Sequence, residues 1–279
     1  MTTANHFPES LLNIAEEQTA KADQKAKGLQ AQADEAASIQ KLCQNVTSYL
    51  KRGWTLHLLD AIDKQDPLLK KMKVDNHSTI SFLEEIYQIA KEEASQIKYH
   101  FFPRELEEAC RVANLPLDRD STHPNYKFEN GFFQIRIDDH KKTARLSDYE
   151  LPKLCEVPAD VGAIIEAVQR EQKRVFGRKF DAKVFLKKLR KQYLEVIKKQ
   201  KLTDGSSIPI RDITRRLGKN EKGFRTDEFL IDLSRLVEQN FTEIEGRKFE
   251  FTQTKDTTQG LLLHIENKRY IGSILFKKV

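Results

Sequence analysis

The spacing of apolar residues predicts a long amphipathic helix at the start of the chain. From about Ser10 to Leu59, small and apolar side chains recur every three or four residues. Gly53 interrupts the pattern and predicts a break or kink there. The recurring positions are Ala15, Ala22, Ala26, Leu29, Ala33, Ala36, Cys43, Val46 and Leu50. Alanine buries little area, so this stripe needs a partner surface: an intramolecular helical hairpin, or a coiled coil with a second copy or a partner protein.

Further helices are predicted in the rest of the first 117 residues. A loop over residues 66–76 leads to Ser81 and Glu84, whose spacing is that of a capping box for a helix running towards Tyr99. Pro103 begins another helix. We therefore expect residues 1–117 to form a helical region.

Residues 118–157 show the pattern of a small antiparallel β-meander. Asn130-Gly131 suits a type I′ turn, which requires positive φ angles. After this turn, Phe133, Ile135 and Ile137 alternate with polar residues, so one face of the strand is expected to be buried. A third strand is predicted at residues 143–146, with the meander packed on the preceding helices.

Residues 158–279 return to helical spacing and end in strands. Helices are predicted after Pro158 and at residues 182–200, 210–217 and 227–239. Strands are predicted at residues 248–252, 260–265 and 269–276. The expected fold is α+β and predominantly α-helical, with a helical region, a meander and a C-terminal domain.

Composition narrows the class of protein. The chain is 39% hydrophobic and 32% charged, with no long uncharged apolar run, which predicts a globular, cytoplasmic protein without a membrane span. Its three cysteines form no CxxC pair, so no disulfide framework or zinc site is expected. Cys43 and Cys110 are expected to be small core residues.

The net charge of +6 is divided unevenly along the chain. Residues 1–160 contain 21 basic and 26 acidic side chains, whereas residues 161–279 contain 27 basic and 16 acidic ones. A basic surplus confined to one part of a chain indicates a surface for phosphates there. We expect that part to contact DNA or possibly RNA.

A helix, a short helix, a turn, a third helix and a β-hairpin follow one another at 182–200, 210–217, 227–239 and 248–265. In this order of elements and in its charge, the C-terminal domain resembles the winged-helix superfamily. The resemblance implies that the third helix enters the major groove and that the wing contacts the DNA backbone. The cations expected to contact phosphates are Lys187, Lys191, Arg211, Arg215, Arg216, Lys219, Lys222, Arg225, Arg247, Lys248 and Lys255.

The third helix carries acidic side chains that phosphates would repel. Its polar positions, expected to be exposed, are Asp227, Glu228, Asp232, Ser234, Arg235 and Glu238. DNA would then dock through the wing or the long basic helix. Alternatively, the domain grips a protein, as winged-helix subunits of SMC-type ATPases do.

Enzyme motifs are sparse. Asp138, Asp139 and His140, with Glu129 and His123, could ligate a metal ion, but they also suit a charged hairpin turn. Asp256 with Glu266-Asn267-Lys268 loosely resembles the D…ExK pattern of metal-dependent nucleases. There is no GxSxG, Walker A or GxGxxG motif. We expect no catalytic residues and no cofactor.

The leading hypothesis is a non-enzymatic nucleic-acid-binding accessory subunit. It would position DNA for a partner ATPase or nuclease in a DNA-processing or phage-defence complex, with the N-terminal helices binding a partner protein or a second copy. The second hypothesis is a structural winged-helix subunit that binds only protein. A transcriptional regulator is third and a metal-dependent nuclease fourth.

Overall fold

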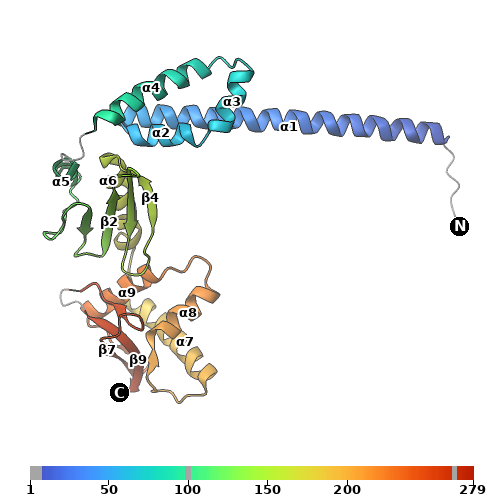
Figure 1. Ribbon diagram of the computed structural model, residues 1–279. Helices are drawn as coiled ribbons and strands as arrows, with labels where there is room; N and C mark the ends of the chain where they lie inside the picture. The colour runs from blue at the N-terminus through green and yellow to red at the C-terminus, as the bar shows by residue number, and fades with distance from the viewer. Residues whose placement is uncertain (1–7, 98–101, 266–268) are drawn as a thin grey trace. The chain divides into compact units, whose positions relative to one another are not determined.

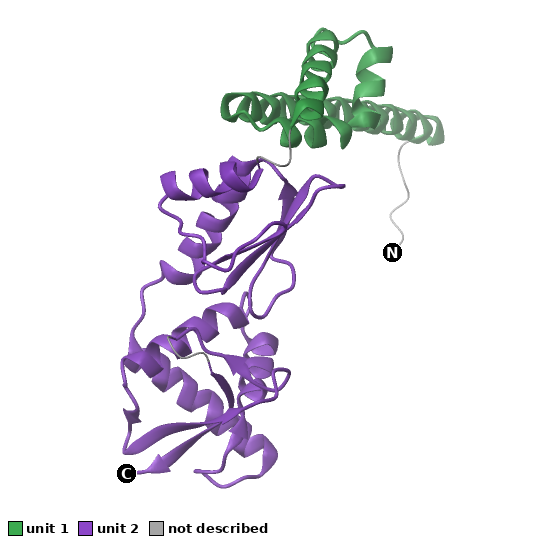
Figure 2. Ribbon diagram, turned by 60° about the vertical axis from the view of Figure 1, so that its left-hand side comes forward, with its two compact units in different colours: residues 1–97 green, residues 98–279 purple. Residues whose placement is uncertain are grey.

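The chain folds into two compact units. The computed structural model describes residues 8–97, 102–265 and 269–279. Its contacts separate residues 1–97 (unit 1) from residues 98–279 (unit 2), coloured separately in Figure 2. Unit 1 is helical and unit 2 mixes helices with antiparallel sheets (Figure 1), so the fold is of the α+β kind predicted from the sequence. The predicted meander and C-terminal domain lie together in unit 2.

Unit 1 is built on one very long helix. Its elements are α1 (Glu9–Arg52), α2 (Thr55–Asp63), α3 (Asp66–Val74) and α4 (Ile80–Gln96). The break predicted at Gly53 is confirmed: α1 ends there, where the glycine adopts a left-handed φ of 66°. The loop predicted over residues 66–76 is wrong, because Pro67 lies in the first turn of α3, where proline suits a helix. The core comprises Leu42, Val46, Leu58, Ile62, Met72, Leu83, Ile86 and Ala90.

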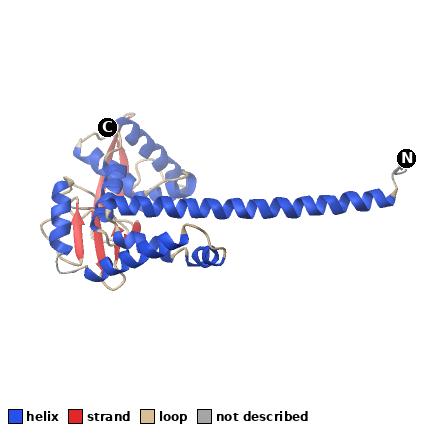
Figure 3. Ribbon diagram, turned by 90° about the horizontal axis from the view of Figure 1, so that it is seen from above, coloured by secondary structure: helices blue, strands red, loops and turns tan. Residues whose placement is uncertain are grey.

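Only the C-terminal part of α1 packs on the rest of unit 1, and it does so mainly outside the predicted stripe. Ile39, Leu42, Val46 and Tyr49 lie in the core or against it. Residues 9–34 are exposed throughout, along a helix that Figure 3 shows as one continuous rod. Leu29 and Leu50 of the predicted stripe are 58% and 49% exposed. Larger side chains such as Leu42 bury more apolar area than alanines do, so α1 packs in unit 1 by the face that carries them.

The first part of unit 2 is a four-stranded antiparallel sheet in chain order. It consists of β1 (Asn125–Phe128), β2 (Phe133–Asp138), β3 (Thr143–Ser147) and β4 (Cys155–Pro158). Helix α6 (Val161–Phe176) contacts β3, β4 and α5 (Phe102–Val112). The predicted meander is confirmed, with Phe133, Ile135 and Ile137 buried. β4 was not predicted because its four residues are all half-buried and show no alternation.

The turn between β1 and β2 is longer than the two residues predicted. Phe128 pairs with Phe133, which leaves Glu129, Asn130, Gly131 and Phe132 in the loop. The first three have positive φ angles of 52°, 54° and 79°. Phe132 is fully buried, with its ring centroid 5.3 Å from that of Phe176. Burial of this ring therefore explains the longer loop.

The second part of unit 2 combines three helices with a second sheet. The helices are α7 (Ala182–Gln200), α8 (Ile210–Asn220) and α9 (Thr226–Glu238). The strands are β5 (Ile208–Pro209), β6 (Glu243–Ile244), β7 (Arg247–Thr254), β8 (Leu261–Leu262) and β9 (Tyr270–Lys278). The order across the sheet is β5-β9-β7-β6, with β8 also paired to β9. Tyr193 of α7 packs on Phe276 of β9, with ring centroids 5.1 Å apart.

The predicted hairpin of residues 248–265 is wrong in its second strand. β7 pairs along its whole length with β9, from Arg247 opposite Lys278 to Thr254 opposite Tyr270. β8 is only two residues long. The run of Ile271, Ile274 and Phe276, all fully buried, gives β9 the larger apolar face and so the central place in the sheet.

In the described part of the chain, no helix is both long enough and apolar enough to cross a bilayer.

Candidate nucleic-acid interface

The exposed face of α7 carries a row of lysines. Lys183, Lys187, Lys191 and Lys198 are separated by four or seven residues, so they lie on one side of the helix, and all four are exposed. The row covers about 22 Å of helix. The opposite side, which includes Leu186, Leu189, Tyr193, Val196 and Ile197, is buried. The apolar face thus fixes which way the lysines point.

α8 lies along α7 in the antiparallel direction, as three side-chain contacts show. Asp212 accepts a hydrogen bond from Gln200 at 2.9 Å, Arg216 pairs with Glu195 at 3.0 Å, and Glu221 pairs with Lys188 at 2.7 Å. A second row of cations, on α8 and in the loop that follows it, therefore belongs to the same helix pair. We call the two rows the α7–α8 basic surface: Lys183, Lys187, Lys191, Lys198, Arg215, Lys219 and Lys222, all exposed.

The acidic residues of this segment are already paired with internal cations. Residues 183–222 contain 13 basic and 4 acidic side chains. The pairs are Glu195 with Arg216, Asp204 with Arg190, Asp212 with Arg215, and Glu221 with Lys188. The net positive charge of the segment therefore resides mainly on exposed lysines, where it is available to phosphates.

The structure divides the predicted phosphate-contact residues into two groups. Seven are exposed: Lys187, Lys191, Arg215, Lys219, Lys222, Lys248 and Lys255. The first five of these belong to the α7–α8 basic surface, whereas Lys248 lies on β7 and Lys255 follows that strand. The other four are half-buried in ion pairs: Arg211 with Glu150, Arg216 with Glu195, Arg225 with Asp227, and Arg247 with Asp204. To contact a phosphate, each of these four would have to exchange its carboxylate partner.

α9 does not present the exposed acidic face that its sequence predicts. Asp227 and Ser234 are only 1% and 2% exposed. The acids of α9 are covered because arginines of α6 and of the residues that follow it pair with them. Arg174 pairs with Asp227, and also with Glu228 at 2.6 Å. Arg178 pairs with Asp232 at 2.9 Å. Glu238 at the end of α9 is exposed as predicted, but Asp227, Glu228 and Asp232 are paired with these arginines, so most of the acidic charge of α9 is neutralised and the helix is not free to enter a major groove.

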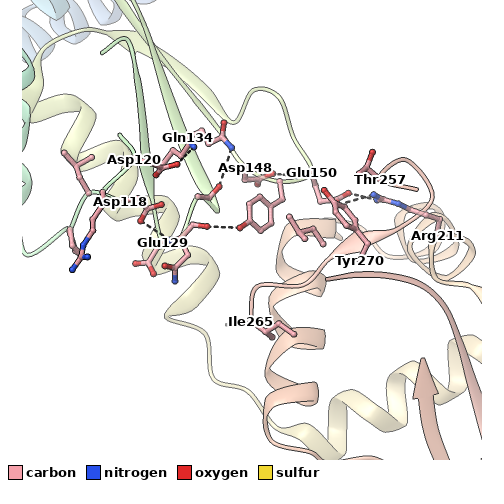
Figure 4. A pocket seen from close by; sticks show the side chains of 18 residues that line it. Asp118, Asp120, Glu129, Gln134, Asp148, Glu150, Arg211, Thr257, Ile265 and Tyr270 are labelled. Atoms are coloured by element: carbon pink, nitrogen blue, oxygen red, sulfur yellow. Dashed lines mark hydrogen bonds and ion pairs between the residues drawn. The ribbon is translucent and has the colours of Figure 1, made fainter. Parts of the chain in front are cut away.

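A polar cleft of about 1170 Å³ lies within unit 2, between the first sheet and the C-terminal elements (Figure 4). Arg211 lines it, bound to Glu150 at 2.5 Å and to the carbonyl oxygen of Gly260 at 2.7 Å. Asp120 is paired with Lys127, and Glu129 accepts a hydrogen bond from Gln172. The ion pair between Arg211 and Glu150 therefore links the two parts of unit 2, whereas the contacts of Asp120 and Glu129 lie within its first part.

Two buried carboxyl groups meet where the first sheet packs on α9. Asp148 Oδ1 accepts hydrogen bonds from the backbone N–H groups of Glu150 and Leu151, at 2.8 and 2.7 Å. Its Oδ2 is buried without a donor, beside the carboxyl group of Asp227. Burial, opposed by those two N–H groups and reinforced by Asp227, raises the pKa of Asp148 to about 6. Burial also disfavours the charged form of Asp227, but Arg225 and Arg174 outweigh it and lower the pKa.

The residues of the two metal hypotheses have other roles in the described structure. Asp138 accepts a hydrogen bond from the backbone N–H of Lys141, and Asp139 lies 2.9 Å from Nε2 of His123. Asp256 accepts hydrogen bonds from the backbone and hydroxyl of Thr258. Residues 266–268 lie outside the described residues. Among the residues that are described, no three His, Cys, Asp or Glu side chains gather as a metal site would require.

Lys183 and Lys198 belong to the basic surface but were not among the predicted contacts. Their four- and seven-residue spacing from Lys187 and Lys191 is visible in the sequence and could have identified them. Cys110 is buried as predicted, whereas Cys43 is half-buried. Comparison with protein-family models, with curated proteins and with solved structures finds no match for this chain.

Proposed function

We propose that this protein is a non-enzymatic, nucleic-acid-binding accessory subunit. It would hold DNA, or possibly RNA, on the α7–α8 basic surface for a partner ATPase or nuclease. We place it in the cytoplasm, in a DNA-processing or phage-defence complex. The observation that carries the proposal is the double row of exposed cations on two antiparallel helices and the loop after α8, a segment whose acidic residues are already paired.

The burial of α9 supports contact with the backbone rather than with bases. Lysine side chains contact phosphates without reading sequence. A helix that reads base edges must enter the major groove, and α9 is covered by α6. The three helices and the β7–β9 pair follow the order of a winged-helix domain, which would then bind DNA through its first helix, α7. Because α9 is covered, a sequence-specific regulator is disfavoured.

A purely protein-binding subunit is the second candidate. Val184 and Leu194 lie on α7 near the lysine row and are 65% and 40% exposed. Exposed apolar residues next to lysines suit a protein contact as well as a nucleic-acid contact. The two candidates differ in their salt dependence, because release of counterions from DNA makes phosphate binding weaken steeply with salt.

The first prediction tests the basic surface. Replacing Lys183, Lys187, Lys191 and Lys198 by glutamine should weaken binding to a generic DNA duplex by at least about tenfold. The slope of log affinity against log salt should shrink by roughly 3 to 4, because each phosphate contact contributes about 0.9. Fluorescence anisotropy between about 50 and 200 mM salt measures both quantities, with an RNA duplex as the parallel probe.

A matched control changes the net charge equally at another place. Lys41, Lys64, Lys70 and Lys91 of unit 1 are exposed, and their replacement by glutamine should leave the affinity and the salt slope nearly unchanged. Equal losses in both quadruple variants would contradict a localised interface. Binding to neither duplex at low salt would leave the protein-binding candidate.

A further inference from the structure

The exposed part of α1 has no role in the proposed function. Residues 9–34, which we call the α1 arm, form about 26 residues, or roughly 39 Å, of fully exposed helix. Leu11, Leu12, Ile14 and Leu29 are 52%, 43%, 53% and 58% exposed. Large apolar side chains exposed along one helix indicate a missing partner surface.

The arm contains a seven-residue repeat of small and apolar side chains. The positions alternate in steps of three and four residues and continue just past the arm: Leu12, Ala15, Thr19, Ala22, Ala26, Leu29, Ala33 and Ala36. This spacing of 3.5 residues is the signature of a helix that supercoils with another helix. We call these eight residues the arm seam.

The arm seam points away from the face by which α1 packs in unit 1. The packed face contains Ile39, Leu42, Val46 and Tyr49. At 100° per residue, its centre lies roughly 160° around the helix from the centre of the arm seam. A second helix can therefore cover the seam without disturbing the core of unit 1.

We propose that the occupant of the arm seam is the α1 arm of a second copy of this chain, in the antiparallel direction. When Ala22 of one copy lies opposite Ala26 of the other, Leu12 faces Ala36 and Leu29 faces Thr19, so that every leucine meets a small residue. Both arrangements contain layers of alanine on alanine, but parallel pairing in register would also place leucine on leucine. The leucine layers would then hold the helices apart and leave voids at the alanine layers.

The area available for an interface is ample. The chain exposes 18211 Å², whereas two separate compact bodies of about 11 and 21 kDa would expose roughly 15,000 Å². The difference of roughly 3,000 Å² exceeds the approximately 1,600 Å² of a standard protein interface. An extended helix accounts for much surface that a partner can remove from water.

The charge of the arm favours a protein helix over nucleic acid as its occupant. Residues 9–34 contain five acidic and three basic side chains, so phosphates would be repelled. The arm seam fits a helix that is nearly neutral and rich in alanine. The α1 arm of a second copy is such a helix. A pair of identical arms also satisfies the two-fold symmetry of most protein dimers.

Sedimentation equilibrium of the full chain tests the dimer. The wild-type protein should change from monomer to dimer between about 1 and 100 µM. Replacing Ala22 and Ala33 by glutamate places charges in the seam and should raise the dissociation constant at least about 100-fold. A wild-type chain that stays monomeric at about 100 µM would overturn the proposal.

The same helix offers a matched control. Ala20 and Ala31 have the same eleven-residue separation and are exposed on the side opposite the seam. Glutamates at these two positions change charge and helix propensity equally, so helicity by circular dichroism should fall equally in the two variants. The control should dimerise within about twofold of wild type. Equal dissociation of both variants would refute the seam as the interface.

A spin-label distance tests the direction of pairing. Cys43 and Cys155 are replaced by serine, and Asn13 by cysteine to carry a nitroxide. Cys110 stays unlabelled because it is buried, and burial, reinforced by the charge of Glu107, raises the pKa of its thiol to about 11. Antiparallel arms separate the two labels by about 33 Å along the axis, whereas parallel arms leave them under about 20 Å apart. A short distance would contradict the antiparallel arrangement.

Discussion

Replacing Arg174 by methionine is expected to destabilise unit 2 by about 3 kcal/mol. Arg174 binds Asp227 and also Glu228 and Glu171, and the Asp227 side chain is fully buried. Without the guanidinium, that carboxylate keeps the backbone N–H of Glu228 and a single cation, Arg225, while Asp148 still faces it. A buried charge that loses one of its partners costs far more than an exposed one.

The loss of stability in unit 2 alone can be measured by following the protection of the Cys110 thiol from alkylation at increasing urea concentrations. The thiol is buried in α5, so alkylation detected by mass spectrometry reports the opening of that unit. Lys173 is the adjacent, exposed residue on α6, and its replacement by methionine should change stability by less than about 0.5 kcal/mol. Combining Arg174→Met with Asp227→Asn should recover part of the loss. Similar values for the two methionine variants would show that the ion pairs contribute little.

Replacing Asp148 by asparagine is expected to stabilise unit 2 by about 2 kcal/mol at neutral pH and to change little near pH 4. The pKa of Asp148 is raised in the folded chain, from 3.8 to about 6. The folded state therefore binds the proton more tightly than the unfolded state. The resulting stability is fully present below pH 3.8 and is lost as the pH rises through 6. Asparagine keeps the oxygen that accepts the two backbone hydrogen bonds, and its amide can donate to Asp227.

Hydrogen-exchange protection factors of α9, compared between pH 4 and pH 7.5, measure this effect after correction for intrinsic exchange. The wild type should lose protection as the pH rises from 4 to 7, and Asp148→Asn should lose much less. Asp181→Asn is the control, because Asp181 is the N-cap residue of α7 and asparagine also caps a helix. A pH dependence that is unchanged in Asp148→Asn would show that another group carries it.

Helices with one clearly apolar face could be predicted from the sequence. α7 combines Leu186, Leu189 and Tyr193 at helical spacing with a capping aspartate, and its bounds match the prediction. The exposed lysine row of α7 can be predicted from the same pattern, because the residues of the buried face determine which residues of the helix are exposed. The central strands of the meander were predictable for the same reason, because Phe133, Ile135 and Ile137 alternate with polar residues.

Features that depend on distant residues could not be predicted. The acids of α9 look exposed in the sequence because their partners, Arg174 and Arg178, lie about 50 residues earlier in the chain. β7 pairs with β9 and not with the predicted strand at residues 260–265, because the number of residues that can pair depends on both strands. In α1, the alanine spacing indicates a helix, but it does not reveal that larger side chains on another face pack in the core of unit 1.

The ion pairs across unit 2 decide where the chain can be cut for fragment studies. A fragment that begins at residue 158 would deprive Arg211 of Glu150, and it would expose Phe176, which packs on Phe132. Such a fragment should aggregate, and a loss of DNA binding in it would say nothing about the lysines. A fragment that begins at residue 98 keeps these contacts, so this boundary is the one at which deletion mapping can separate the roles of the two units.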